Sequence, residues 1–210
     1  METAGQDGNV DEGADGSPAP GENRLLFSDA MREGHHCLDV SGAGPDDDVA
    51  CLVVSLDDPV DAVVDRWRRH GHAESGELAA VSVGETTRSA AAATGSGSVV
   101  ELTDDVKTTT VSDASDLTGL GIRISECLKA WSGREEAVVC FDSLTSLLQF
   151  AGVERVFQFL HVLTSRFREV DARAHFHIAP AAHDDQTIAT LRSLFDGTYE
   201  RTADGDWREV

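Results

Sequence analysis

The most constraining feature of the sequence is an uninterrupted apolar run from Ala137 to Phe141, which ends at Asp142. The run shows neither the 3.6-residue spacing of an amphipathic helix nor the alternation of a half-exposed strand. It is typical of a strand buried on both faces, as in the interior of a parallel sheet. A chain with such a segment must place structure on both sides of a sheet.

Asp142 stands at the expected carboxyl end of this strand. In open α/β sheets ligands bind beside the carboxyl ends of the strands, and a carboxylate there can hold Mg²⁺ through water. Asp142 is therefore a candidate metal-linked and cofactor-binding residue, together with the adjacent Ser143. The alternative is that Asp142 caps a helix beginning at Ser143, because aspartate is a preferred N-cap residue.

Apolar spacing predicts strands and helices that alternate along the chain. We expect strands at residues 37–40, 49–55, 78–83, 99–102, 137–141 and 174–178, and helices at 23–32, 59–69, 116–131, 143–150, 153–167 and 184–195. Asp204 and Gly205 predict a turn that joins segments 198–201 and 207–210 into a C-terminal hairpin. This alternation indicates an α/β fold with a mostly parallel central sheet and helices on both faces.

Acidic residues dominate the composition and separate a tail from a domain. Residues 1–22 contain no basic side chain and almost no large apolar one, so we predict a disordered acidic tail. Residues 23–210 are long enough for a single domain with a core. The net charge of −21 argues against direct nucleic-acid binding, which needs clustered Lys and Arg. Such an excess of carboxylates is typical of a salt-adapted cytoplasm, where ions screen self-repulsion.

Four cysteines and the absence of apolar spans bear on the cellular compartment. Cys37, Cys51, Cys127 and Cys140 show no CxxC spacing, and we interpret them as reduced, buried thiols rather than a disulfide or zinc framework. No run reaches the length of a membrane span, and the N-terminus lacks the basic and apolar regions of a signal peptide. We expect a cytoplasmic protein without a membrane partner.

Two motifs resemble those of RecA/KaiC-like ATPases. Residues 52–58 (LVVSLDD) resemble the family's second strand with its catalytic carboxylates, and residues 138–145 (VVCFDSLT) resemble its Walker B strand. A closer likeness is to haloarchaeal KaiC-like proteins of unassigned function, through residues 67–69, 116–122, Phe150 and 177–184. The resemblance spans residues 37–210 and implies a RecA/KaiC-like three-layer sandwich.

The resemblance assigns roles to two further carboxylates. Asp57 and Asp58 match the catalytic position at which the ATPases orient the attacking water, and Asp142 matches the Walker B residue that holds Mg²⁺. The alternative for Asp57 and Asp58 is a turn and helix cap before Pro59.

The phosphate-binding loop of the resembled ATPases is missing from its expected place. That loop needs Gly-x-x-x-x-Gly-Lys-Ser/Thr, because backbone N–H groups and the lysine neutralise the phosphates. After the expected strand 37–40 the sequence instead holds SGAGPDDD at residues 41–48, with no lysine and three adjacent carboxylates. At 4 Å and an effective dielectric of 20, each like-charge contact costs about 4 kcal/mol before screening. We therefore expect no cofactor, with ATP and Mg²⁺ only under the alternative of an atypical phosphate site.

Two groups of histidines carry metal-ligating atoms. One is His35, His36 and Cys37, and the other is His177 with His183 and Asp184. Neither group has a second pair of ligands at a recognised spacing, so structural or surface histidine is the alternative interpretation for both. His175 and His177 are two residues apart on one strand and must share one face of the sheet.

Three functions follow as hypotheses. The first is a catalytically inactive RecA/KaiC-like domain that acts as a regulatory or signalling module by binding a protein partner, with homo-oligomerisation left open. The second is a KaiC-like signalling protein that binds or hydrolyses ATP through Asp57, Asp58 and Asp142. The third is a receiver-like phosphoacceptor that uses Asp57 and Asp142, although no suitable lysine lies near its last strand.

Overall fold

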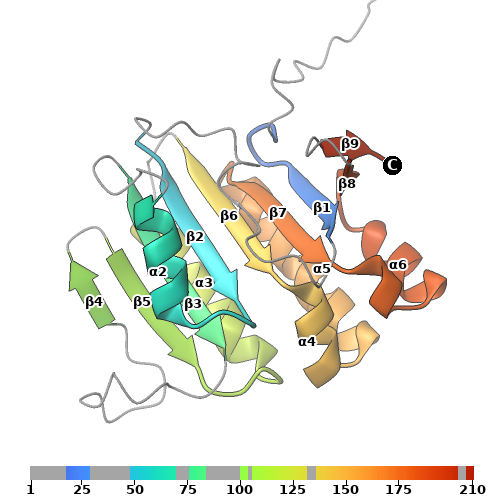
Figure 1. Cartoon of the computed structure of the whole chain (residues 1–210), viewed down its shortest axis with the longest axis horizontal. Coiled ribbons are helices and arrows are strands. Elements are labelled where there is room, and N and C mark those ends of the chain that lie inside the picture. Colours follow the sequence, from blue (N-terminus) through green and yellow to red (C-terminus); the bar gives the residue numbers. More distant parts are fainter. Residues whose placement is uncertain are drawn as a thin grey trace, which may run out of the picture.

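The computed structural model describes residues 18–28, 48–69, 76–83, 100–103, 106–131, 136–202 and 207–210. Over these ranges one nine-stranded sheet has the order β4-β5-β3-β2-β6-β7-β1-β8-β9 (Figure 1). Its strands are β1 Asn23–Phe27, β2 Ala50–Ser55, β3 Glu77–Val83, β4 Val100–Thr103, β5 Val106–Val111, β6 Ala137–Asp142, β7 Arg173–Ile178, β8 Gly197–Arg201 and β9 Trp207–Glu209. Neighbouring strands are parallel except at the two edges, where β4 pairs with β5 and β8 with β9 in antiparallel fashion. The predicted α/β fold and the C-terminal hairpin are confirmed.

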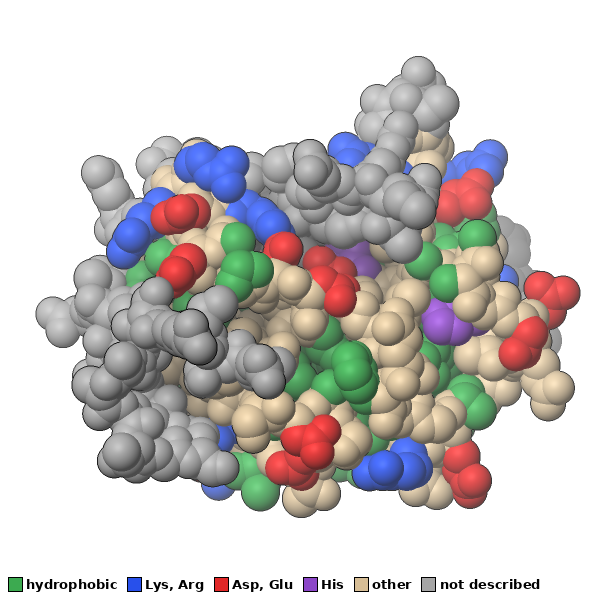
Figure 2. Space-filling view, turned by 60° about the horizontal axis from the view of Figure 1, so that its bottom comes forward, with side chains coloured by type: hydrophobic (Ala, Val, Ile, Leu, Met, Phe, Trp, Pro, Cys, Tyr) green, Lys and Arg blue, Asp and Glu red, His purple; other side chains and the backbone are tan. Residues whose placement is uncertain are grey.

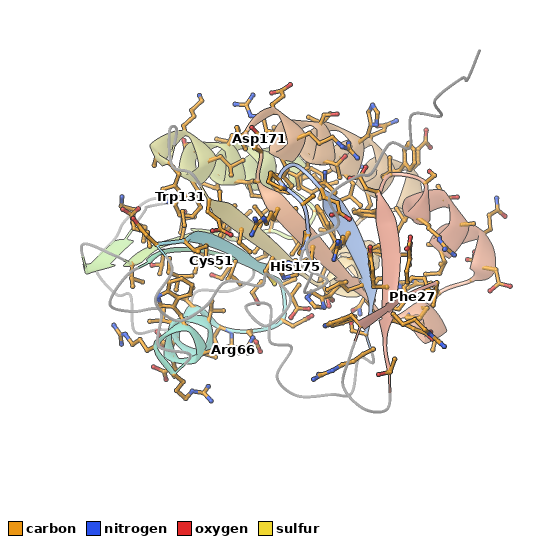
Figure 3. All side chains as sticks on the ribbon, turned by 90° about the horizontal axis from the view of Figure 1, so that it is seen from above. Phe27, Cys51, Arg66, Trp131, Asp171 and His175 are labelled. Atoms are coloured by element: carbon orange, nitrogen blue, oxygen red, sulfur yellow. The ribbon has the colours of Figure 1, made fainter. Side chains whose placement is uncertain are left out.

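Helices cover both faces of this sheet. They are α2 Val60–Arg69, α3 Leu117–Ala130, α4 Leu144–Phe150, α5 Val153–Glu169 and α6 Asp185–Arg192, with a short 3-10 turn at Pro180–Ala182. Viewed along the sheet, α2 lies on one side and α3 and α5 lie on the other (Figure 3). On the α2 side, Val64 and Trp67 pack with Cys51 of β2. On the other side, Leu52 and Val54 of the same strand join the larger core. Alternate residues of one strand therefore serve both layers.

The larger core is centred on aromatic side chains. Phe176 of β7 stacks on Phe141 of β6 with 5.6 Å between ring centroids. The same ring lies 6.0 Å from Phe167 of α5 and 5.0 Å from Phe195, which follows α6. Phe141, Phe167 and Phe176 are fully buried. One ring thus joins two central strands to the helical layer.

Side chains cap three of the helices at residues that the sequence analysis places near helix starts. Asp116 accepts a hydrogen bond from the Gly119 backbone N–H (2.8 Å), and Asp184 accepts one from Thr187 (2.7 Å). At the start of α4 the cap is Ser143, whose hydroxyl accepts from the Ser146 N–H. Within the described ranges, no helix combines the length and apolarity needed to cross a bilayer.

The prediction of a helix at residues 23–32 is wrong, because residues 23–27 form strand β1. This strand pairs in parallel with both β7 and β8, and Leu25 and Leu26 are fully buried. Its polar residues are accommodated: Arg24 pairs with Glu22 at 2.7 Å and lies over the ring of Tyr199. A short apolar run fits a helix or a strand equally well by spacing alone, and tertiary pairing decides between them. The described structure begins at Pro18, so residues 18–22 of the predicted tail belong to it.

Strand β5 has no counterpart among the predicted elements. It carries three successive threonines, which make the segment look polar, yet Thr108 and Thr109 are buried between β3 and the edge strand β4. Threonine is β-branched and fits a pleated, half-buried surface. The predicted strand at residues 37–40 and the loop at residues 41–48 lie almost entirely outside the described residues.

Candidate functional site

The carboxyl ends of β2 and β6 lie at the point where the chain changes direction across the sheet. From β2 the chain crosses over α2 to β3 on one side, and from β6 it crosses over α4 and α5 to β7 on the other (Figure 1). Ligand sites of open α/β sheets occur at such switch points, outside the carboxyl ends of the strands. Asp57, Asp58 and Asp142 all lie here, and we call them the acidic edge. All three were named as candidate site residues from the sequence.

Asp142, the last residue of β6, lies against the end of β2. It pairs in register with Ser55 of β2, and its carbonyl oxygen accepts a hydrogen bond from the Leu56 N–H at 2.8 Å. Burial raises the pKa of its carboxyl group to about 6, with Asp57 and Asp58 adding repulsion and Arg66 opposing them. Because Ser143 caps α4, the alternative that Asp142 is the helix cap is wrong.

Asp57 accepts hydrogen bonds from serines at the start of α4. Its carboxylate accepts a hydrogen bond from the Ser146 hydroxyl at 2.6 Å and another from the Ser143 hydroxyl at 3.2 Å. Ser146 is itself buried. Ser143 was a candidate from the sequence and Ser146 was not, although two serines three residues apart at a helix start are typical of a capped first turn. Asp57 thereby joins the end of β2 to α4.

Asp58 faces the other way and forms an ion pair with Arg66, two turns along α2. The Asp58 N–H donates to the Ser55 hydroxyl at 3.0 Å, which closes the turn after β2. Arg66 was not singled out from the sequence, because a pairing between a loop residue and the second turn of the next helix has no fixed spacing. Of the described ion pairs, this one brings a positive charge to the acidic edge.

The acidic edge gathers three carboxylates beside one arginine. Three carboxylates repel a polyanion, and an ion pair with Asp58 already engages Arg66. The group of metal-ligating side chains found in the described residues excludes Asp57, Asp58 and Asp142. Acidic side chains beside an apolar patch are visible on the face that includes this edge (Figure 2).

The predicted grouping of His177, His183 and Asp184 is not formed in the structure. His183 contacts the Thr145 hydroxyl at 3.3 Å, and burial lowers the pKa of its ring. Asp184 caps α6, and the hydrogen bonds from Thr187 lower the pKa of its carboxyl group. His177 is buried in the sheet instead. The other predicted group, at residues 35–37, lies outside the described part of the chain.

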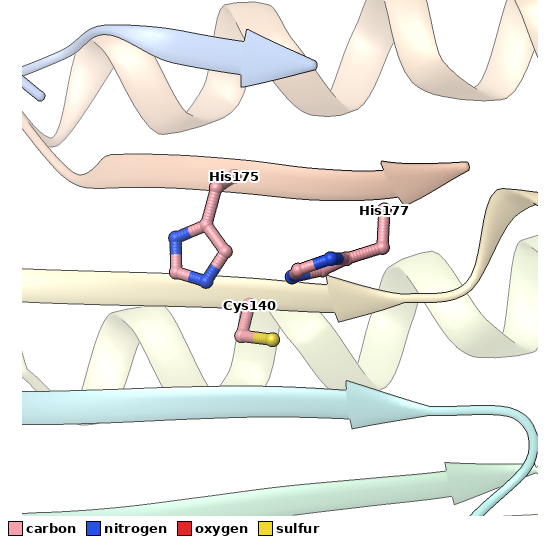
Figure 4. A group of neighbouring side chains, drawn as sticks. All are labelled: Cys140, His175 and His177. Carbon is pink, nitrogen blue, oxygen red and sulfur yellow. The ribbon is translucent and has the colours of Figure 1, made fainter. Parts of the chain in front are cut away.

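His177 belongs to a different cluster, on the face of the sheet that carries α2. Cys140 of β6 is the register partner of His175 on β7, and His177 lies two residues further along (Figure 4). The ligand atoms of these three residues lie within 4.8 Å of one another. We call Cys140, His175 and His177 the Cys/His cluster.

The cysteines differ from one another in their chemical state. Cys51 and Cys127 are free, and burial raises the pKa of the two thiols to about 12 and about 11. Cys140 is disulfide-bonded, so the prediction that all four cysteines are reduced thiols is wrong. Sequence spacing carries no information on a bond that joins residues distant along the chain.

An open groove of about 700 Å³ runs between α3 and α5. Apolar side chains protrude into it, with Ile122 of α3 52% exposed and Val162 of α5 69% exposed. Three basic residues and one acidic residue complete its charged lining: Lys129, Arg155, Arg166 and Glu126. This groove was not predicted from the sequence, because exposed apolar residues on two helices become neighbours only when the helices pack.

Two solved structures share this fold. One is described as a structural study of Project ID PH0250 from Pyrococcus horikoshii OT3, with 12% identity and a TM-score of 0.55 over 91% of this chain and 86% of that one. The other is NeqB, described as a unique ATP synthase subunit from Nanoarcheaum equitans, with 9% identity and a TM-score of 0.56 over 88% of this chain. This chain spans 46% of NeqB. No curated protein matches the sequence.

A family of proteins does match most of the chain. The family is DUF7504, described as a family of unknown function, and the match covers residues 21–200. These residues run from just before β1 into β8, so they include the acidic edge, the Cys/His cluster and the α3–α5 groove. The chain therefore belongs to the DUF7504 family.

Proposed function

We propose that this chain is a catalytically inactive RecA/KaiC-like domain that acts as a regulatory or signalling protein-interaction module in a salt-rich cytoplasm. The observation that carries the proposal is the α3–α5 groove, which offers a partner an apolar surface. Exposed apolar patches rimmed by polar residues typically mark interaction sites. The expected partner contributes an acidic segment with apolar anchoring side chains.

The lack of a lysine after the first strand supports the absence of catalysis, whichever segment is taken as that strand. In the resembled ATPases the phosphate loop follows the first strand. The first described strand here, β1, ends at Phe27, so the segment to compare with that loop starts at Ser28 and not at Ser41. The sequence SDAMREGHH at residues 28–36 contains no lysine and a single glycine. Lys107 lies near the start of β5 and Lys129 near the end of α3, so both are remote from the acidic edge.

Charge complementarity supports an acidic partner segment. Acidic residues outnumber basic ones by 38 to 17 in the chain, whereas the groove has three basic residues and one acidic residue. In molar salt the Debye length is about 3 Å, so these bases act only on groups in direct contact with them. The apolar side chains should then supply most of the affinity, and the bases should select the partner.

A photo-crosslinking residue at Gln158, an exposed position of the groove, tests this proposal in native extract at native salt. We expect a covalent product with an acidic segment of a second protein, reduced at least tenfold by Val162→Asp and about twofold by Arg166→Gln. Val162 is 69% exposed, so this substitution should leave the fold intact.

A matched control places the same crosslinker at Asp65, an exposed residue of α2 on the opposite face. Equal products from positions 65 and 158 would contradict a specific groove. Products formed only with residues 1–17 of the same chain would show that the acidic tail, and not a partner, fills the groove.

ATP is the second candidate ligand, favoured by the position of the acidic edge at the switch point and by the likeness to NeqB, described as an ATP synthase subunit. We expect calorimetry with ATP and Mg²⁺ at molar salt to show no binding, because the carboxylates repel the triphosphate. Micromolar affinity that disappears in Asp142→Asn would replace the inactive domain with an ATP-binding protein.

A further inference from the structure

The Cys/His cluster has the geometry of a metal site that needs only small movements to close. Cys140 and His175 face each other across neighbouring strands, and the rings of His175 and His177 meet edge to face with centroids 5.5 Å apart. Ligand atoms that share an ion at 2.0–2.3 Å lie at most about 4.4 Å apart. The atoms here lie within 4.8 Å of one another, which is close to that limit (Figure 4).

Unsatisfied ring nitrogens provide a second, independent indication of a ligand. His175 is fully buried, and neither of its ring nitrogens has a hydrogen-bond partner among the residues that the structure describes. His177, the neighbouring member of the cluster, is also buried. Buried polar groups are nearly always paired, so an apolar side chain would fill this space at lower cost. Metal ions bind histidine through the neutral imidazole, whose ring nitrogen offers a lone pair.

The sulfur of Cys140 becomes a ligand only after reduction, because it is disulfide-bonded. Two molecules of a thiol reductant supply two electrons and two protons, convert this disulfide into two protein thiols, and are themselves joined in a new disulfide. The Cys140 thiol then releases its proton as the thiolate bonds to the ion. The same cysteine therefore couples the redox state of the protein to metal binding.

The charge of the cluster selects the ion. One thiolate and two neutral imidazoles sum to a single negative charge, and the described group contains no carboxylate. A monovalent ion leaves a neutral buried site, whereas a divalent ion leaves a net positive charge that is costly to bury. Thiolate and imidazole together suit a soft ion. We propose that the reduced protein binds one Cu(I) ion through Cys140, His175 and His177, and that disulfide formation at Cys140 abolishes the site.

Competition for Cu(I) against a coloured chelator tests the proposal on the full chain, reduced under anaerobic conditions and freed of reductant. We expect one Cu(I) per reduced chain, X-ray absorption that shows sulfur and nitrogen donors, and no tight binding by the oxidised chain. Cys140→Ser should weaken binding at least 100-fold, and His175→Leu at least tenfold. Cys51→Ala is the matched control, since Cys51 is a buried free thiol on the same face of the sheet. It should bind like the native chain.

The variants also separate a metal ligand from a merely structural histidine. His175→Leu removes unsatisfied polar atoms, so the oxidised variant should unfold at or above the native midpoint temperature while it loses Cu(I) binding. His177→Leu serves as the second variant if the first does not fold. Native-like Cu(I) affinity in either folded histidine variant, or no binding by the folded reduced chain, would overturn the site. Tighter binding of Zn²⁺ than of Cu(I) in a parallel titration would overturn the assignment of the ion.

Discussion

Replacing Phe176 by alanine should destabilise the protein by about 3 to 5 kcal/mol, which is the usual cost of removing a buried phenylalanine. This ring contacts Phe141, Phe167 and Phe195, so the substitution also removes aromatic pairs that join β6, β7, α5 and the segment after α6. A domain is typically stable by only 5 to 15 kcal/mol, and the variant should therefore be partly unfolded at growth temperature. Urea unfolding in molar salt, followed by circular dichroism, measures the difference.

Phe150→Ala is the control for this experiment. Phe150 ends α4 and is 56% exposed, so its truncation leaves no buried cavity. We expect a change within about 0.5 kcal/mol, as for ordinary surface substitutions. Equal losses in the two variants would show that the aromatic cluster around Phe176 is not the centre of the core.

Asp142→Asn should stabilise the protein at neutral pH, by about 1 to 3 kcal/mol. The pKa of Asp142 is raised from 3.8 to about 6 in the folded protein, chiefly because burial penalises the charged carboxylate. Between these values the folded state holds a proton that the unfolded state has released, so the free energy of unfolding falls as pH rises. At about 1.4 kcal/mol per pH unit, the full rise corresponds to at most about 3 kcal/mol. Asparagine carries no charge and avoids this loss.

The stability difference between Asp142→Asn and the native protein should increase with pH. Near pH 4 the native and variant proteins should unfold at similar urea concentrations, and the gap should open as pH rises to about 7. Asp65→Asn controls for the general benefit of removing a negative charge from a chain with a net charge of −21. Asp65 is exposed, so its variant should differ little from the native protein over this range. A variant Asp142→Asn that is less stable than the native protein at pH 7 would contradict the prediction.

Local patterns were sufficient for most of the fold. The apolar run before Asp142 predicted strand β6, and helical spacing predicted α2, α3 and α5 to within a few residues. The turn signal at Asp204 and Gly205 correctly paired β8 with β9. These predictions hold because periodicity and turn chemistry are properties of neighbouring residues. They fail at β1 and β5, where pairing with adjacent strands outweighs an ambiguous or polar local pattern.

The candidate sites also combine features that the sequence predicts with features that depend on tertiary packing. Parallel strands bring their carboxyl ends to one edge, so the convergence of Asp57, Asp58 and Asp142 was predictable from sequence. The partners Ser146 and Arg66 were not, because they depend on how α4 and α2 are oriented on the sheet. Tertiary packing likewise created the α3–α5 groove from residues about 40 positions apart.

The sequence by itself determined the α/β layering and the excess of acidic residues, since each is encoded in composition or short spacing. It also placed His175 and His177 on one face of their strand. Only the tertiary structure decided that Cys140 lies opposite His175, because strand order and register are set by packing of the whole sheet. For the same reason, the three-dimensional fold alone turned three scattered side chains into a buried cluster with unsatisfied nitrogens.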